Sequence, residues 1–469
     1  MPAPATRANL ESLLREALSE ASGRRGQTVV SVTLPYECED PVATVFASRR
    51  AGEPFFCWEQ PDRDLRLAAL GRIHEISSRG ENRFVEVAAD CAHLSGEAVL
   101  RGEGGFTTGP VWTGGFAFHD DGTDGRRQPD PAWSSFGPAS MILPELAIQS
   151  SEASTFLTVN LMVGAGSGID ELLQAALARV DGLIHTELPM IDPHPTSQPS
   201  IESVRSPEQY ESSVAQAVER IKAGEIEKVV LAREVVVRAP SAHDPAAIFG
   251  ALRVGFPSCF NFCVGTGEAA FIGASPELLV RCNGRGVSTV GLAGSTRRSS
   301  DPAVDDHLAQ QLLGSAKDRG EQAVVVRRIV KTLSRISVWV EAAEEPEIIK
   351  VANIQHLGTP VYAQLAQPRT AIELAGLLHP TPAVGGEPWK KARTVMAEVE
   401  EMDRGWYAGP VGWMDGSGDG EFCVALRSAL IRDREAHLFA GVGVVADSDP
   451  AAELAETEIK LGALLPLLS

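Results

Sequence analysis

Three features that this sequence lacks exclude whole classes of protein. Its seven cysteines are scattered and include no C-x-x-C pair, which excludes a disulfide-rich scaffold and favours small buried thiols in a reducing cytoplasm. No His/Cys cluster has the spacing of a zinc site. No run approaches the roughly 18 apolar residues of a membrane span, and the first residues contain no apolar signal segment. We therefore expect a soluble cytoplasmic protein without a membrane partner.

Positive charge is also scarce. The chain of 469 residues has 42 Lys and Arg against 62 Asp and Glu, a formal net charge of -20. Binding to a phosphate backbone needs a basic surface that releases counterions, so nucleic acid is excluded as an expected partner. If the ligand is itself an anion, local Arg and Lys side chains or a bound cation must offset the overall field.

Two Gly-rich segments lack the frameworks of the common nucleotide-binding loops. GLAGSTRRS (291–299) and AGVGVVADSDP (440–450) contain neither the Walker A sequence nor G-x-G-x-x-G. We predict that both are turns, and that their backbone N–H groups are available to a carboxylate. Ordinary turns are the competing interpretation.

The order of the predicted elements indicates an α+β fold. Strand-like runs such as EKVVLAREVVV (227–237), CFNFCVG (259–265) and LLVRCN (278–283) alternate irregularly with helical segments, without regular βαβ order or an internal repeat. The Pro- and Ser-rich stretch at 187–207 is the best candidate for a boundary. We therefore divide the chain into parts 1–197 and 198–469.

Acidic residues recur at i, i+3 spacing near two predicted helix starts. Asp449 and Pro450 are suited to begin a helix that carries Glu453, Glu456 and Lys460 on one face. Asp318 and Glu321 begin another helix with the same spacing. Two such pairs facing one another would make an all-oxygen site for Mg2+. Alternatively, the acidic residues favour helix N-termini for dipole reasons alone, and Glu456 and Lys460 form an ordinary surface pair.

Three further charged residues stand beside apolar strands. Lys228 stands where EKVVLAREVVV begins, so it is either a partly desolvated general base or a lysine that extends to solvent. Glu277 follows the strand FIGAS and a Ser-Pro turn, where it either stays protonated as a general acid or caps the turn. Arg427 is predicted inside an apolar strand, so its guanidinium needs an anionic partner from the protein or from a ligand.

These segments, in this order, strongly resemble the chorismate-utilising enzymes, the family of isochorismate, salicylate, anthranilate and aminodeoxychorismate synthases. The resemblance is most specific over residues 205–469, and the first half matches more loosely. The segments that carry it are KVVLAR, FIGASPELL, GLAGSTRR, KDRGEQAVVV, NIQHLGTPV, LLHPTPAVGGEP, RGWYAGPVGW, VALRSALI, AGVGVVADSDP and ELAETEIK. The resemblance implies one α+β unit with a large antiparallel, sandwich-like β core surrounded by helices.

The resemblance also implies the reaction and its catalytic pair. Members that use water as the nucleophile resemble this chain at Lys228 and Glu277. The implied reaction converts chorismate to isochorismate: Lys228 deprotonates a water that adds at C2, and Glu277 protonates the hydroxyl that leaves C4. The two roles require a neutral amine and a protonated acid near neutral pH.

By the same resemblance, the remaining motif residues hold a metal and the substrate. Glu321 and Glu456 would ligate Mg2+, and Asp318 and Glu453 would orient its waters. The residues implied to contact chorismate are Gly294, Ser295, His356, Ala383, Tyr407, Arg427, Gly441 and Lys460. No glutaminase partner is expected, and the family precedent favours a monomer.

Two alternatives to isochorismate synthesis remain open. Salicylate synthase performs the same first step and then eliminates pyruvate, but Ala383 and Val384 resemble the synthases that stop early. A catalytically inactive binding protein would be unlikely to keep Lys228, Glu277 and the metal carboxylates together. Anthranilate and aminodeoxychorismate synthesis are disfavoured by Lys228. The product would serve menaquinone or siderophore biosynthesis.

Overall fold

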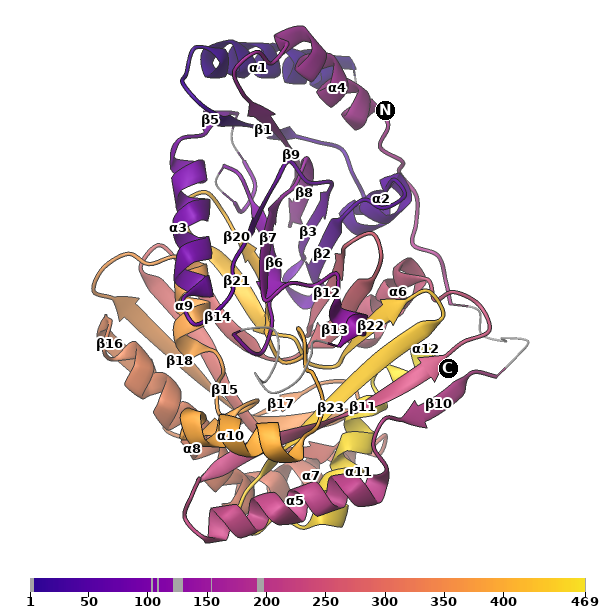
Figure 1. Cartoon of the computed structure of the whole chain (residues 1–469), viewed down its shortest axis with the longest axis vertical. Helices are drawn as coiled ribbons and strands as arrows, with labels where there is room; N and C mark the ends of the chain where they lie inside the picture. Colours follow the sequence, from indigo (N-terminus) through magenta and orange to yellow (C-terminus); the bar gives the residue numbers. More distant parts are fainter. Residues whose placement is uncertain are drawn as a thin grey trace.

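A computed structural model of the chain describes residues 4–102, 104–107, 109–120, 130–152, 154–191 and 198–468. Two large sheets form its centre, and helices cover their outer faces (Figure 1). All the strand pairs of both sheets are antiparallel except β1 (Thr28–Pro35) with β5 (Val99–Arg101). The structure therefore confirms the predicted α+β class with an antiparallel core.

Within the described residues, the first sheet has 13 strands. Strands from the later part of the chain form one edge, and β1 and β5 form the other. The order is β10 (Ser200–Ser203), β11 (Lys228–Arg238), β23 (Glu435–Val444), β22 (Ser428–Arg432), β13 (Ala270–Ser275), β12 (Phe260–Gly265), β2 (Phe55–Gln60), β3 (Leu65–Leu70), β8 (Leu146–Ser151), β9 (Ser154–Val163), β1 and β5, with β19 (Gly386–Glu387) beside β11.

The second sheet has 10 strands in the part of the chain that the structure describes. Its order is β16 (Ser337–Ala342), β18 (Ile354–Leu365), β15 (Gly286–Arg297), β14 (Leu278–Asn283), β21 (Gly420–Val424), β20 (Pro410–Met414), β6 (Trp112–Phe116), β7 (Ala139–Leu143) and β4 (His74–Ser77), with β17 (Glu347–Lys350) beside β18.

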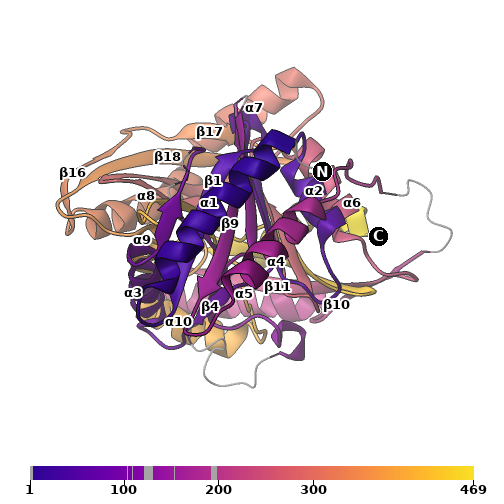
Figure 2. The same ribbon diagram turned by 90° about the horizontal axis from the view of Figure 1, so that it is seen from above.

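The helices lie outside the two sheets. In Figure 2, α1 and α4 lie side by side over β1 and β9. At the opposite end, α5 and α11 pack against one another and cover β11 and β23 (Figure 1). The helices are α1 (Pro4–Ser22), α2 (Pro41–Ser48), α3 (Arg83–Gly96), α4 (Ile169–Asp181), α5 (Pro207–Lys222), α6 (Pro245–Gly255), α7 (Pro302–Gly314), α8 (Ala316–Leu333), α9 (Ala371–Leu378), α10 (Trp389–Val399), α11 (Pro450–Leu461) and α12 (Leu465–Leu468), with short 3-10 turns at Pro61–Arg63 and Pro131–Trp133.

The sequence signals for helix starts are realised in the contacts. Ser206 caps α5 through its hydroxyl, which accepts a hydrogen bond from the N–H of Gln209, and the Gln209 side chain returns a bond to the Ser206 N–H. Asp449 caps α11 through its carboxylate, which accepts a hydrogen bond from the N–H of Ala452. Pro450 takes the first helical position, where no N–H is needed. These caps fix where the acidic face of α11 begins.

Both parts of the sequence contribute to both sheets. In the first sheet, β2 pairs with β12, and in the second, β6 pairs with β20. The predicted boundary therefore does not separate two sheets, because each sheet contains strands from both sides of it. Residues 192–197 of that boundary lie outside the described residues. Among the helices that the structure describes, none is both long and apolar enough to cross a membrane.

The glycines of the two Gly-rich segments lie in strands, so the prediction of turns is wrong there, and only residues 445–449, between β23 and α11, form a turn. Gly294 lies within β15 at a bulge, with φ of 73°, and Gly441 and Gly443 lie within β23. The glycines are needed for close packing: a Cβ on Gly443 would collide with Glu321 and Lys228, and one on Gly441 would lie 3.1 Å from the Tyr407 hydroxyl.

Candidate active site

The site lies where the chain passes from one sheet to the other. Pro276 and Glu277 connect β13 of the first sheet to β14 of the second, and residues 425–427 return the chain from β21 to β22. The prediction that Arg427 lies inside a strand is therefore wrong. Its φ of 46° places it at the break that this change of sheet requires. Glu277 and Arg427 thus lie on two connections between the sheets that run in opposite directions, and both line the same cavity.

The predicted site residues gather around one cavity. It has about 760 Å³ of empty space, part of it open to solvent, which lies within the range of small-molecule pockets. Of the predicted residues, Lys228, Asp318 and Glu453 do not line it. The residues that do are Glu277, Gly294, Ser295, Glu321, His356, Ala383, Tyr407, Arg427, Gly441, Glu456 and Lys460.

Lys228 lies directly behind the wall of this cavity. It is the first residue of β11, its side chain has no exposed surface, and its Nζ is 2.7 Å from Glu321 Oε1. Glu321 itself lines the cavity, on the first half of α8. The alternative in which Lys228 extends to solvent is therefore wrong, because its side chain is fully buried and β11 is covered by β19, α5 and α10.

Glu277 is buried and favours its neutral form. Burial raises the pKa of Glu277 to about 8, although the positive charges of Lys228 and Lys460 and a hydrogen bond from Thr381 act in the opposite direction. Thr381 Oγ1 lies 3.5 Å from Glu277 Oε1. At neutral pH this carboxyl therefore holds a proton that it can donate into the cavity.

The acidic residues of α8 and α11 are each paired in this structure. Glu456 accepts hydrogen bonds from the Ser295 hydroxyl at 2.6 Å and forms an ion pair with Lys460 at 2.9 Å. Although burial acts against it, these partners hold the pKa of Glu456 below its usual value. Glu453 is 2.9 Å from Lys317, and Asp318 accepts a hydrogen bond from the hydroxyl of its N-cap, Ser315.

The donor set suits a hard divalent cation that keeps water ligands. Within the described ranges, no three His, Cys, Asp or Glu side chains are close enough to enclose a metal ion. However, Mg2+ is typically bound through one or two carboxylates, several waters and an anionic ligand. Burial raises the pKa of Asp318, and the negative charges of Glu321 and Glu456 raise it further, which indicates that both carboxylates repel the charge of Asp318. A cation between them would relieve that repulsion, and the residues therefore fit Mg2+.

Arg427 and His356 contact one another at the cavity wall. Arg427 Nη2 lies 2.7 Å from His356 Nε2, and because a guanidinium only donates, that nitrogen accepts. The proton of His356 is then on Nδ1, which is 3.3 Å from the Gly294 carbonyl oxygen. Arg427 Nη1 is buried without a hydrogen-bond partner among the residues described. A buried guanidinium with a free donor is suited to bind a ligand carboxylate.

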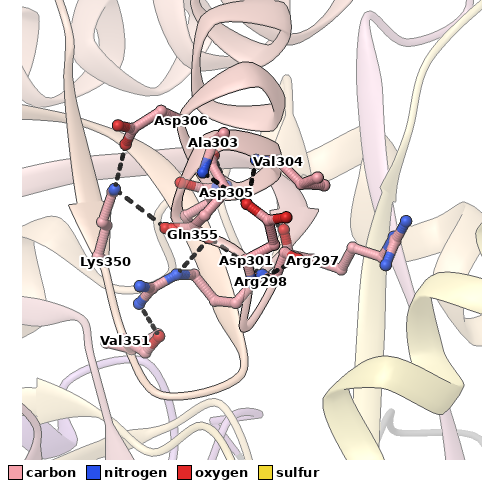
Figure 3. A network of polar contacts seen from close by, with 11 residues as sticks. Arg297, Arg298, Asp301, Ala303, Val304, Asp305, Asp306, Lys350, Val351 and Gln355 are labelled. Carbon is pink, nitrogen blue, oxygen red and sulfur yellow. Dashed lines mark hydrogen bonds and ion pairs between the residues drawn. The ribbon is translucent and has the colours of Figure 1, made fainter.

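The strand that carries Ser295 is anchored just beyond the cavity. Arg298 donates to Asp305 Oδ1 at 2.8 Å and to the Val351 carbonyl at 2.9 Å, and Lys350 lies between Asp305 and Asp306 (Figure 3). The hydrogen bond from Arg298 holds the pKa of Asp305 below its usual range. This network joins the start of α7 to β15 and β17, so Ser295 is held on a rigid strand. Arg298 is thereby used for structure and not for the ligand.

Sequence reasoning missed several residues that shape the site. Thr381 contacts Glu277, Lys317 neutralises Glu453, and Gly443 allows Lys228 and Glu321 to approach. A fully buried ion pair of Arg404 with Glu400 also supports the wall, since Arg404 donates to the carbonyls of Val384 and Val230. Thr381 and Gly443 lie inside motifs quoted from the sequence. Their roles could have been found only by knowing that Thr381 lies in a loop beside Glu277 and that Gly443 lies in a strand beside Lys228.

Comparisons with known proteins agree with this geometry. The family model described as chorismate binding enzyme matches residues 16–469. The salicylate biosynthesis isochorismate synthase of Pseudomonas aeruginosa is 35% identical over 98% of this chain and 94% of its own length. The isochorismate synthase MenF of Bacillus subtilis is 31% identical over 96% of each chain.

A solved structure agrees with both. That of the menaquinone-specific isochorismate synthase MenF from Escherichia coli has a TM-score of 0.79 at 25% identity and covers 98% of this chain and 100% of that one. A match along nearly the whole sequence, together with the shared fold, shows that this chain belongs to the chorismate-binding enzyme family.

Proposed function

We propose that this protein is an isochorismate synthase, an isomerase that converts chorismate to isochorismate. The observation that carries the proposal is that a buried amine and a protonated carboxyl meet at one cavity: Lys228 lies directly behind its wall, and Glu277, whose pKa of about 8 keeps it protonated, lines it. Relatives of this chain that cover almost its whole length are named isochorismate synthases. An amine and a protonated acid at one cavity are suited to add water at one carbon and remove hydroxide from another.

In the proposed reaction each of these groups moves one proton. Lys228 takes a proton from the water whose oxygen bonds to C2. The C1–C2 double bond of the ring moves to C1–C6 and the C5–C6 double bond moves to C4–C5 as the C4–oxygen bond breaks, and Glu277 gives its proton to the departing hydroxide, which leaves as water. After the reaction Lys228 carries one proton more and Glu277 one proton fewer, and exchange with solvent restores both groups. The water that leaves replaces the water that was added, so no water is consumed.

The other residues bind and orient the dianionic substrate. We assign one carboxylate of chorismate to Arg427 and Tyr407, with N–H groups near Gly294 and Gly441, and His356 orients the guanidinium. Glu321 and Glu456 would hold Mg2+, and Asp318 and Glu453 would position its waters. When bound, the metal would neutralise the ring carboxylate and share the charge of Glu321, which otherwise serves Lys228 as its partner. The cation thereby supplies locally the positive charge that a chain of net charge -20 lacks.

The alternative product is salicylate, formed if pyruvate is eliminated from isochorismate in the same cavity. One relative is named for salicylate biosynthesis, although that name also calls it an isochorismate synthase. Ala383 and Val384 line the cavity and offer no side-chain group to abstract a proton, which favours release of isochorismate. We propose that the enzyme acts as a cytoplasmic monomer without a glutaminase subunit and supplies menaquinone or siderophore biosynthesis.

The purified protein is expected to convert chorismate to isochorismate when MgCl2 is present. Chromatographic separation of the products decides between the candidates. Isochorismate supports the proposal, salicylate with an equal amount of pyruvate supports the alternative, and unchanged chorismate supports an inactive binding protein. A sample treated with a chelator and then resupplied with MgCl2 tests the metal requirement.

The metal assignment predicts that Glu456→Gln weakens Mg2+ binding at least about tenfold, because the change removes one of two charged ligands. Isothermal titration with MgCl2 in the absence of chorismate measures this effect. Glu458→Gln is the matched control, since Glu458 lies on the same helix but pairs with Arg233 outside the cavity. Equal affinity in wild type and Glu456→Gln would remove Glu456 from the metal site.

A further inference from the structure

One loop contacts both proposed catalytic groups. The segment between α9 and α10 contains β19, which pairs with Lys228 and Val229 at the start of β11. The Val230 N–H donates to the Gly385 carbonyl at 2.8 Å, which continues this pairing. At its other end the same loop brings the Thr381 hydroxyl to Glu277 Oε1, 3.5 Å away. The loop thus spans the distance between the base and the acid.

Thr381 is held in place by the loop itself. Its carbonyl oxygen accepts hydrogen bonds from the N–H groups of Val384 at 3.1 Å and Gly385 at 2.9 Å. Thr381 is 4% exposed, and Arg404 stabilises the same turn by donating a hydrogen bond to the Val384 carbonyl. A hydroxyl on so constrained a backbone has few positions available, so its contact with Glu277 is a fixed feature of the site.

The chemistry of this contact distinguishes the two oxygens of the carboxyl group. A neutral carboxyl has one O–H donor and one carbonyl oxygen that accepts. In the described part of the chain, Glu277 Oε1 is the one partner of the Thr381 hydroxyl, so donation to Oε1 satisfies the hydroxyl whereas acceptance would leave its hydrogen unpaired. An oxygen that accepts this bond is the carbonyl oxygen, and the proton of Glu277 is then on Oε2.

We propose that Thr381 is a positioning residue, which keeps the proton of Glu277 on Oε2 so that this oxygen faces the leaving hydroxyl as the donor. The proposal rests on the role of Glu277 as general acid. Without the Thr381 hydroxyl the two oxygens compete for the proton, and part of the enzyme holds it on Oε1. The loop therefore orients the acid as well as lining the cavity.

The test compares Thr381→Val, which removes the hydroxyl at nearly constant shape, with Thr381→Ser, which keeps it. Infrared spectroscopy of the protonated carboxyl, assigned by its absence in Glu277→Gln, should show the carbonyl band at higher frequency in Thr381→Val and at the wild-type frequency in Thr381→Ser. The midpoint of its pH titration should also rise in Thr381→Val, because the lost bond stabilises the charged form.

The kinetic effect should fall on turnover and not on binding. We expect kcat of Thr381→Val to drop about tenfold, the effect of one hydrogen bond, with KM within about twofold of wild type. Thr158→Val is the matched control, because Thr158 is equally buried but bonds to Thr33 in the first part of the chain. It should leave both the band and kcat unchanged.

Two results would overturn the proposal. One is an unshifted carboxyl band in Thr381→Val, and the other is a Thr381→Ser variant as impaired as Thr381→Val, which would assign the effect to the lost methyl group. The infrared measurement needs no turnover, so it separates this inference from the proposed function. A shifted band in a protein that makes no isochorismate would refute the function while retaining the position of the proton.

Discussion

Lys228→Ala is expected to lower kcat for isochorismate formation by about 10²–10⁴-fold, the range of general-base catalysis, while the protein stays folded. We propose the buried amine as the group that activates water; it lies directly behind the cavity wall, with its Nζ 2.7 Å from Glu321 Oε1. Steady-state kinetics with chorismate measures the loss. Turnover close to that of wild type would refute the assignment of Lys228 as the base.

Folding must be measured beside activity, because the substitution also removes the partner of Glu321. A carboxylate that loses a buried partner destabilises a protein by up to about 3–5 kcal/mol, although Glu321 keeps some contact with solvent. Circular dichroism and thermal unfolding of Lys228→Ala and of Lys228→Met, which keeps most of the side-chain volume, separate the two effects. Lys331→Ala, at an exposed position on α8, should be fully active.

Glu277→Gln is expected to lower kcat by a similar factor and to abolish the alkaline limb of the pH profile. In wild type, burial raises the pKa of Glu277 to about 8, so activity should fall as pH rises through about 8 and the acid loses its proton. An amide has no such proton at any pH. The pH dependence of kcat/KM for both proteins tests this assignment, and an unchanged alkaline limb in the variant would assign the limb to another group.

The same substitution is expected to stabilise the protein at high pH. Between the usual value of 4.5 and the raised pKa of about 8, the folded chain holds a proton on Glu277 that the unfolded chain releases. The free energy of unfolding of wild type therefore falls as pH rises through this window, by about 3 kcal/mol at pH 7. Glu277→Gln removes this contribution, so its advantage should grow from pH 5 to pH 8 and then level off.

Urea unfolding at a series of pH values measures that difference. The exposed Glu344→Gln, between β16 and β17, is the matched control and should follow wild type across the series. A constant difference between Glu277→Gln and wild type from pH 5 to pH 8 would show that Glu277 is already ionised at neutral pH. In that case it does not serve as the acid.

Much of the local structure was predictable because it depends on short-range signals. The capping residues Ser206 and Asp449 fixed two helix starts, and the β-branched run after Lys228 is a buried strand, as its composition indicates. The irregular order of the predicted elements indicated the α+β class, and the family resemblance added the antiparallel core and the residues that line the cavity, including Glu277 and Lys460.

The errors came from long-range packing that no local pattern records. Gly441 and Gly443 resemble turn residues, but they lie in a strand because Tyr407 and Glu321 need the space that a side chain would fill. Arg427 appeared to continue a strand, yet the chain changes sheets there. The contact of Thr381 with Glu277 joins residues 104 positions apart, so only the folded structure reveals it.

Glu277 and Arg427 each follow a strand of one sheet and precede a strand of the other. Each is therefore tied on both sides to a hydrogen-bonded layer, and neither has the freedom of a surface loop. The separation between acid and anion-binding groups is set by how the two layers stack. A mutation far from the ligand that alters this stacking would change the fit for every substrate at once, whereas selectivity between related substrates is left to the side chains of the 381–385 turn.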